Sequence, residues 1–324
     1  MEPADRLPRP PDRPPDRPII LLLEDDTEVG WLQPFAGGQL WSEQPVGVGA
    51  ARAPRPPVRT DISAARTDWS VIYDGPGWVD GGLYRLQSFL SERGERRVDF
   101  EDGESFLVDA AGGQVRRLGG GPANARSEER ALGAPMALAL ALRGVHLLHA
   151  SAVARRSADG GLSGAVAFTA LSGAGKSTLA AATVPIAGGA GAGGDTLERI
   201  ADDQLPVRLG SRPETLPHFP QLKLPPASGY PAAAAARLAF ARLVEIEHSA
   251  EVGAIEIARL SPAAACLALA RATVAAKLFD PDLLQRHFEA CAAAAQELPV
   301  HRLRFPTGLE HLPAVLAAVA NLDA

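Results

Sequence analysis

The chain has 324 residues, of which 46% are hydrophobic and 22% are charged, and its formal net charge at pH 7 is −6. This composition suits one large soluble domain or two moderate ones, and a net negative chain has no overall attraction for nucleic acid or an anionic membrane. No stretch has the pattern of a signal peptide or a membrane-spanning helix, so we expect a cytoplasmic protein that contacts neither membrane nor nucleic acid.

The first part of the chain predicts a disordered tail followed by a β-rich subdomain. Residues 1–18 consist largely of Pro, Arg and Asp and have little apolar surface to bury, which is typical of disorder. Residues 19–130 contain short apolar runs between Gly- and Pro-rich stretches, and the run at Ile19–Leu23 predicts a buried strand. Arg97–Phe100 and Ser105–Asp109 alternate apolar and polar residues across an Asp-Gly turn, which predicts a hairpin.

The pattern then changes to a helix followed by two strands. Ser127–Leu142 predicts a helix that is closed by Gly144, with Pro135 as an alternative start. Val145–Val153 predicts a strand. A Gly-rich linker leads to a second apolar run that ends at Thr169. Two adjacent strands joined by a turn would place His149 beside whatever follows the second strand.

A phosphate-binding loop follows Thr169. The order is an apolar run, a loop of small residues, and then Gly175-Lys176-Ser177-Thr178 at the start of an Ala-rich helix. Small residues let backbone N–H groups surround an anion, and the helix directs the positive end of its dipole towards it. Lys176 would reach the β- and γ-phosphates, and the Ser177 hydroxyl would ligate Mg²⁺. The residues expected to bind the nucleotide are Ser172, Gly173, Ala174, Gly175, Lys176, Ser177 and Thr178.

Two adjacent carboxylates, Asp202 and Asp203, lie downstream in an apolar segment. Phosphoryl transfer needs a second carboxylate on the metal and a group that orients or deprotonates the acceptor. Neighbouring side chains of an extended segment point to opposite faces, so the pair can serve both tasks only if the strand ends there, which Pro206 permits. A solvated Asp pair at a turn is the alternative, and the phosphate loop favours the functional interpretation.

The C-terminal third predicts further strands and helices. Leu243–Glu247 and Ala254–Ala258 alternate cleanly and predict a pair of strands. Two sites combine an N-cap residue with proline at the first helical position, which predicts a helix after each. These sites and the remaining predicted elements are Ser261-Pro262, Asp280-Pro281, a strand at Val300–Phe305 and a closing helix at Leu309–Leu322.

Three segments together resemble the HPr kinase/phosphorylase family. They are Leu148–Val153 with its histidine, the phosphate loop at Ala170–Thr178, and Ala201-Asp202-Asp203. The closer resemblance is to HPr-kinase-like serine kinases among peptide-tailoring enzymes, such as lasso-peptide kinases, and it covers roughly Met136 to the C-terminus. The combination of the three segments is more specific than the loop alone.

The resemblance implies an α/β fold in which a small β-rich N-terminal subdomain precedes a P-loop kinase domain at residues 131–324, of the HPr kinase/phosphoenolpyruvate carboxykinase type with a mixed sheet. It implies ATP and Mg²⁺ as cofactors and transfer of the γ-phosphate to a serine hydroxyl of a peptide or protein, such as a ribosomal peptide precursor. It is compatible with a homo-oligomer. Matched by position, Lys176 binds phosphate, Ser177 and Asp203 contact the metal, Asp202 is the catalytic base and His149 supports that base.

Two other functions remain open from the sequence. A nucleotide-binding regulatory or scaffold protein would keep the phosphate loop without catalysing transfer, and it would have no need of a second carboxylate. A small-molecule kinase would share the site and differ only in its acceptor. Nothing in the sequence identifies the acceptor, distinguishes ATP from GTP, or singles out an arginine that assists the transfer.

Overall fold

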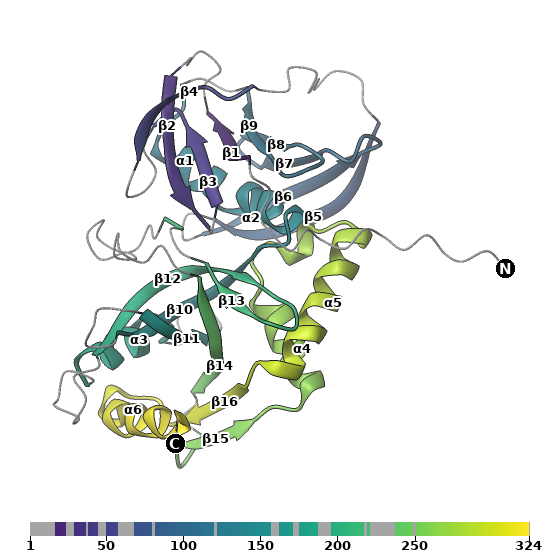
Figure 1. The fold of residues 1–324 in the computed structure, drawn as a ribbon. Coiled ribbons are helices and arrows are strands. Elements are labelled where there is room, and N and C mark those ends of the chain that lie inside the picture. Colours follow the sequence, from purple (N-terminus) through teal and green to yellow (C-terminus); the bar gives the residue numbers. More distant parts are fainter. Residues whose placement is uncertain are drawn as a thin grey trace.

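The computed structural model describes residues 17–23, 29–36, 38–44, 50–57, 68–79, 82–119, 122–156, 162–170, 175–186, 196–216, 219–220, 237–248 and 251–323. Nearly all of the predicted tail at residues 1–18 lies outside these ranges, as do Ser172, Gly173 and Ala174 of the phosphate loop. Over the described ranges the protein is α/β, with two mixed sheets and a preponderance of strands (Figure 1).

The first sheet is formed by residues of the predicted β-rich part and has the strand order β4-β2-β3-β1-β9-β8-β7-β6-β5. The buried strand predicted at Ile19–Leu23 is confirmed, since all four residues of β1 are buried and lie parallel to β3 and β9. The predicted hairpin is confirmed as β7 and β8, with Gly103 at φ +88° in the turn. The strands are β1 (Ile19–Leu22), β2 (Val29–Phe35), β3 (Gly38–Ser42), β4 (Ala51–Pro54), β5 (Trp69–Val79), β6 (Gly82–Ser91), β7 (Arg96–Phe100), β8 (Ser105–Val108) and β9 (Gln114–Leu118).

The helix predicted at Ser127–Leu142 is two helices, α1 (Ala125–Leu132) and α2 (Ala134–Leu142), separated by Gly133. Pro135 lies in the first turn of α2, where its missing N–H has no intrahelical partner to lose, so a new helix starts there. Helix α2 packs against β7, β8 and β9 and is almost wholly buried. The predicted domain boundary between residues 130 and 131 therefore falls inside α1.

The second sheet contains β11, the strand that precedes the phosphate loop. Strands β10, β11, β14, β13 and β12 pair in a closed ring, and β16 and then β15 continue the sheet from β14. Strands β11, β14 and β16 are mutually parallel, whereas β10 runs antiparallel between β11 and β12. The strands are β10 (His146–Arg156), β11 (Leu162–Thr169), β12 (Thr196–Arg208), β13 (Glu214–Thr215), β14 (Leu238–His248), β15 (Glu256–Arg259) and β16 (Val300–Phe305).

The predicted pairing of the segments Leu243–Glu247 and Ala254–Ala258 is wrong. They correspond to β14 and β15, but β16 lies between them and pairs with both. Alternation of apolar and polar residues shows that a strand is half-buried and carries no information about its partner. The late strand at Val300–Phe305 was itself predicted with the bounds that the structure has.

Helices cover the second sheet on two sides (Figure 1). Helices α3 and α6 share one hydrophobic core with Phe168, Val244 and Leu303, while α4 and α5 share another with Leu243 and Val300. The predicted N-caps are confirmed, because Ser261 accepts a hydrogen bond from the N–H of residue 264 and Asp280 from that of residue 283. The elements are α3 (Lys176–Ile186), α4 (Pro262–Ala272), η2 (Ala276–Leu278), α5 (Pro281–Glu297), η3 (Leu309–His311), α6 (Leu312–Ala320) and η4 (Asn321–Asp323).

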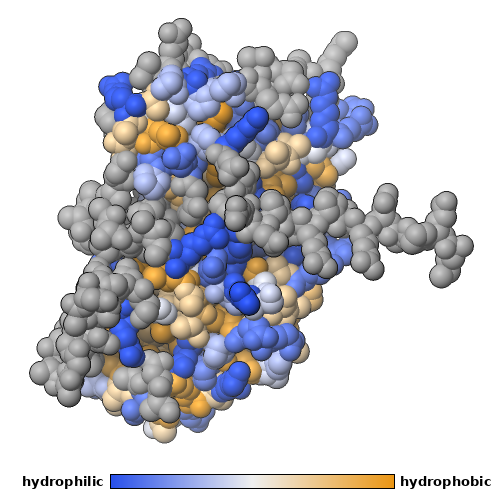
Figure 2. Space-filling model, in the orientation of Figure 1, coloured by the Kyte–Doolittle hydropathy of each residue, from blue (hydrophilic) through white to orange (hydrophobic). Residues whose placement is uncertain are grey.

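The two sheets are joined by a hydrophobic core and a buried ion pair. Leu147 of β10 and Leu278, Phe279 and Leu283 around the start of α5 are buried in the same core as the residues of the first sheet. Arg96 of β7 is paired with Asp280 at the start of α5. On the face shown in Figure 2, hydrophobic and hydrophilic residues are interspersed. The large hydrophobic side chains exposed in the described ranges are Val71, Leu83, Leu267, Leu284, Phe288 and Leu309.

Candidate functional site

The phosphate loop connects β11 to α3, and a lysine holds its two ends together. The ammonium group of Lys176, the first residue of α3, donates a hydrogen bond to the carbonyl of Ala170 at 3.1 Å, and this lysine is buried. Gly175 has φ +86°, and a Cβ there would meet no atom within 4 Å. Backbone conformation, and not crowding, therefore explains the glycine at this position.

Asp202 belongs to a buried polar cluster that reaches the start of α3. The Ser151 hydroxyl on β10 donates a hydrogen bond to Oδ1 of Asp202 at 2.7 Å. The same hydroxyl lies 3.5 Å from the hydroxyl of Ser177. Asp202 is only 5% exposed and Ser151 is fully buried, while Arg199 lies 3.8 Å from Oδ2 of Asp202. Ser151 thus links the first carboxylate of the pair to the predicted metal ligand Ser177.

Asp203 contacts the histidine instead. Its Oδ1 lies 3.3 Å from Nε2 of His149, and the two side chains are 31% and 39% exposed, respectively. The resemblance pairs the supporting histidine with the base and assigns the base to Asp202, whereas His149 lies against the second carboxylate here. Both carboxylates therefore face β10, one towards Ser151 and the other towards His149.

An unusual backbone conformation allows this arrangement. His149 and Ser151 are two residues apart on a strand and share a face, whereas adjacent residues such as Asp202 and Asp203 normally point to opposite faces. Asp203 has φ +112°, a region that residues with a side chain rarely adopt, and this breaks the alternation. The strand does not end at the Asp pair, as the sequence reasoning required for the two carboxylates to serve both tasks, because β12 continues through Pro206 to Arg208.

We expect this conformation to be strained. Asp203→Gly should be more stable than Asp203→Ala by roughly 1 kcal/mol or more, because glycine adopts a positive φ without the steric cost. The same two substitutions at Asp202, whose φ is not positive, should show the opposite order, because glycine there only loses more conformational entropy. Urea denaturation of the four variants measures both differences. If Asp203→Ala were as stable as Asp203→Gly or more stable, Asp203 would not be strained.

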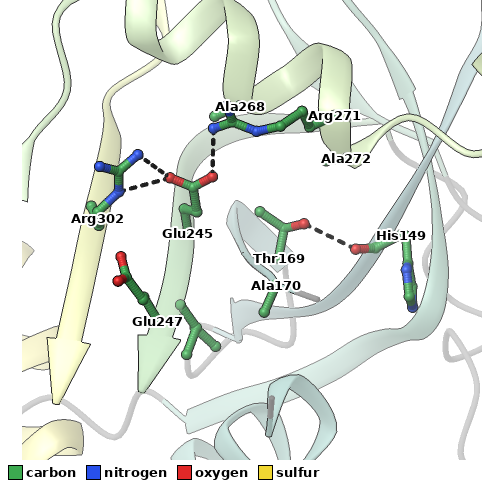
Figure 3. A pocket seen from close by; sticks show the side chains of 10 residues that line it. His149, Thr169, Ala170, Glu245, Glu247, Ala268, Arg271, Ala272 and Arg302 are labelled. Atoms are coloured by element: carbon green, nitrogen blue, oxygen red, sulfur yellow. Dashed lines mark hydrogen bonds and ion pairs between the residues drawn. The ribbon is translucent and has the colours of Figure 1, made fainter. Parts of the chain in front are cut away.

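A pocket of about 470 Å³ lies beside the loop at the carboxyl ends of the parallel strands. Thr169 donates a hydrogen bond to the His149 carbonyl at 3.1 Å, and the His149 imidazole points away from Thr169 (Figure 3). Ligands of α/β sheets commonly bind at this end of the strands. The pocket is lined by His149, Thr169, Ala170, Glu245, Ile246, Glu247, Ala268, Arg271, Ala272 and Arg302.

One carboxylate in this pocket holds two guanidinium groups. Oε1 of Glu245 accepts a hydrogen bond from Arg271 at 2.8 Å, and Oε2 accepts two from Arg302 at 3.0 and 2.8 Å (Figure 3). Burial alone would raise the pKa of Glu245, but the hydrogen bonds and charges of Arg302 and Arg271 together lower it below its usual value. Glu245 therefore stays ionised, and this group of three side chains carries one net positive charge beside the phosphate loop.

The structure brings the predicted residues His149, Lys176, Ser177, Asp202 and Asp203 to neighbouring positions on β10, β12 and α3. Gly175 and Thr178 flank Lys176 and Ser177 at the start of α3. Sequence reasoning missed three residues of the site, Ser151, Glu245 and Arg302. The signal for Ser151 was its spacing of two from His149 in a predicted strand, and the signal for Glu245 and Arg302 was a charge inside a predicted strand. Arg271 could be named from the sequence only as one possible phosphate partner among many arginines.

Comparison of the chain with protein-family models finds no match, and comparison with curated proteins finds none either. In the described ranges, no helix is long and apolar enough to cross a membrane. No group of three or more His, Cys, Asp or Glu side chains in those ranges is arranged to hold a metal ion.

Proposed function

We propose that the protein is an ATP-dependent serine kinase of the HPr-kinase-like type, which transfers the γ-phosphate to a serine hydroxyl of a peptide or protein. One observation carries this proposal. Both carboxylates of the Asp pair face β10, where one is linked through Ser151 to Ser177 and the other contacts His149. A protein that only binds nucleotide has no need of a second, solvent-accessible carboxylate with a histidine partner.

The fold supports the same proposal. The strand before the loop, β11, lies between antiparallel β10 and parallel β14, and the helix after the loop begins at the expected lysine. This order is compatible with the P-loop kinase fold of the HPr kinase/phosphoenolpyruvate carboxykinase type. The first sheet, which shares a core with the second, would then help to present the substrate.

The residues present fit ATP and Mg²⁺. Lys176 and the backbone N–H groups at the start of α3 are suited to bind phosphate oxygens. The Ser177 hydroxyl and an Asp carboxylate supply the oxygen ligands that Mg²⁺ prefers, within a cluster already joined by the Ser151 hydroxyl. When bound, Mg²⁺ neutralises charge on the β- and γ-phosphates. The remaining carboxylate and His149 are exposed enough to meet an acceptor hydroxyl.

Intact-mass spectrometry tests the proposal. Purified protein is incubated with ATP, Mg²⁺ and a panel of serine-containing peptides, and a phosphate-sized mass gain is expected on at least one peptide. Lys176→Ala should abolish the gain. Lys277→Ala is the matched control, because Lys277 is exposed and lies over the Tyr73 ring of the first sheet, so the gain should persist.

Two outcomes would contradict the proposal in different ways. If the protein binds ATP but transfers phosphate to no peptide, protein or small molecule, it is a regulatory nucleotide-binding protein. If transfer occurs only to small hydroxyl compounds added to the same assay, the protein is a small-molecule kinase.

A further inference from the structure

We infer that Asp203 is the general base of this kinase, that His149 positions it, and that Asp202 and Ser151 belong with Ser177 on the Mg²⁺ side of the site. The inference rests on the proposed function. It reverses the roles that the family resemblance implies for the two carboxylates, in which Asp202 is the base and Asp203 contacts the metal.

Exposure separates the two carboxylates. A general base must come within hydrogen-bond reach of the acceptor hydroxyl, which enters from solvent. The Asp203 side chain is 31% exposed, whereas the Asp202 side chain is only 7% exposed and is hydrogen-bonded to Ser151. An acceptor can therefore approach Asp203 without rearrangement of the protein, and Asp202 is shielded from it.

The contacts of the two carboxylates support the same assignment. Oδ1 of Asp202 is held at 2.7 Å by the hydroxyl of Ser151, which lies 3.5 Å from the hydroxyl of Ser177. Asp202 is therefore coupled to the side chain that ligates Mg²⁺ in phosphate-loop proteins. Asp203 is coupled to an imidazole, the group that orients a carboxylate or is oriented by it in many acid–base pairs.

The strain at Asp203 is the third observation. A positive φ of 112° at a residue with a side chain costs of the order of 1–3 kcal/mol and persists only where the surroundings impose it. An Asp that merely met solvent would gain nothing from this conformation. The turn of the backbone brings the second carboxylate to the face of β10 that carries His149 and Ser151, beside the start of α3.

The chemical step follows from these positions. The acceptor oxygen forms a bond to the γ-phosphorus while its proton moves to a carboxylate oxygen of Asp203. The bond between the γ-phosphorus and the oxygen that bridges to the β-phosphate breaks, and ADP leaves with that electron pair. The proton on Asp203 then passes to solvent on its exposed side. His149 holds the carboxylate towards the acceptor throughout.

The matched variants Asp202→Asn and Asp203→Asn, made in the full chain, test the assignment. Calorimetric titration with ADP is performed with Mg²⁺ and with EDTA. Mg²⁺ should raise the affinity for ADP by the same factor in the wild type and in Asp203→Asn. In Asp202→Asn this factor should be at least about tenfold smaller. Ser151→Ala removes the link to Ser177 without changing charge and should lose a smaller part, which keeps the test decisive if Asp202→Asn folds poorly.

Turnover is then measured with the unmodified form of the peptide that the protein phosphorylates. Where no peptide is phosphorylated, ATP hydrolysis is measured, with water as the acceptor. Asp203→Asn should lower kcat by about 100-fold or more with little change in KM for ATP. His149→Gln, whose amide can still donate to Asp203, should keep more of kcat than His149→Leu. Equal losses in these two variants would show that His149 does not act through a hydrogen bond to Asp203.

The outcomes separate this inference from the proposed function. If Asp203→Asn loses the Mg²⁺-dependent gain in ADP affinity and Asp202→Asn keeps it, the roles are those that the family resemblance implies. If Asp203→Asn keeps wild-type kcat, it is not the base. If the wild type binds no ADP at all, the kinase proposal itself fails.

Discussion

Replacing Arg96 with methionine is expected to destabilise the protein by about 3–5 kcal/mol, because it leaves a buried carboxylate without its counter-charge. Arg96 on β7 donates two hydrogen bonds to Oδ2 of Asp280, at 3.0 and 2.5 Å. Both side chains are at most 8% exposed. The other oxygen, Oδ1, accepts the backbone N–H of Leu283 at 3.0 Å and caps α5.

Asp280 of the ion pair with Arg96 also caps helix α5. Burial would raise the pKa of Asp280, but the backbone hydrogen bond from Leu283 and the charge of Arg96 together lower it below its usual value. The ionised carboxylate therefore caps α5 and binds a strand 184 residues away in sequence at the same time. Loss of Arg96 weakens the start of α5 and its attachment to the first sheet together.

Urea denaturation measures this effect, and the chain offers a matched control. Arg85 of the same sheet pairs with Asp74 at 2.6 Å, but these side chains are 62% and 36% exposed. Arg85→Met should therefore destabilise the protein far less than Arg96→Met, because solvent screens an exposed ion pair. Similar losses for Arg96→Met and Arg85→Met would show that the Arg96–Asp280 pair is not shielded from water.

Acidification is expected to destabilise the protein well before its carboxylates are protonated. His146 of β10 and His287 of α5 are buried with ring centroids 4.6 Å apart. Burial, with the charge of His287 as a second cause, lowers the pKa of His146 to about 3, and burial lowers that of His287 to about 4. Phe279 lies against both rings, and Cys291 lies 3.6 Å from His287.

The sign of the effect follows from which state binds protons. In the unfolded chain both histidines take up protons as the pH falls below about 6.5, while the folded state keeps them neutral until about pH 4. Stability is therefore fully present above pH 6.5 and falls below it. Each histidine contributes a slope of about 1.4 kcal/mol per pH unit, or roughly 3 kcal/mol at pH 4.

Urea midpoints measured between pH 7.5 and pH 5.5 check this expectation, since that window lies about one pH unit or more above the ordinary pKa of Asp and Glu. His146→Leu and His287→Leu should each remove part of the slope, and the double variant should remove most of it. The stability of each variant at pH 7.5 separates the packing effect of the substitution from the titration. Unchanged slopes in the double variant would place the acid sensitivity elsewhere in the chain.

Features that depend on a few adjacent residues could be predicted from the sequence. The Asp-Gly turn located the β7–β8 hairpin, and Ser261 and Asp280 marked the starts of α4 and α5, because caps and turns are set by residues within one helical turn. The same kind of short motif predicted that a helix begins at Lys176, Ser177 and Thr178, where α3 begins. The placement of His149 near the loop also followed, since it needed only a strand pair joined by a short linker.

Features that depend on distant residues could not be predicted. Whether β14 pairs with β15 or with β16 depends on contacts between β14 and β16, which lie more than fifty residues apart in sequence. The apolar pattern of a single strand does not identify its partner. The ion pairs of Arg271 and Arg302 with Glu245 form only when α4 and β16 pack beside β14, so the sequence alone does not indicate them. The positive φ of Asp203 has no signature in the sequence, because alternation predicts the opposite face for its side chain.

The arrangement at Glu245 has a consequence for whatever enters the pocket beside the loop. A free arginine side chain has about 2 kcal/mol of rotamer entropy, which a ligand must remove when it recruits the guanidinium. Arg271 and Arg302 are already fixed on one carboxylate, so much of that ordering takes place when the chain folds. A ligand that contacts them meets a preorganised pair of donors, and more of each contact is retained as affinity.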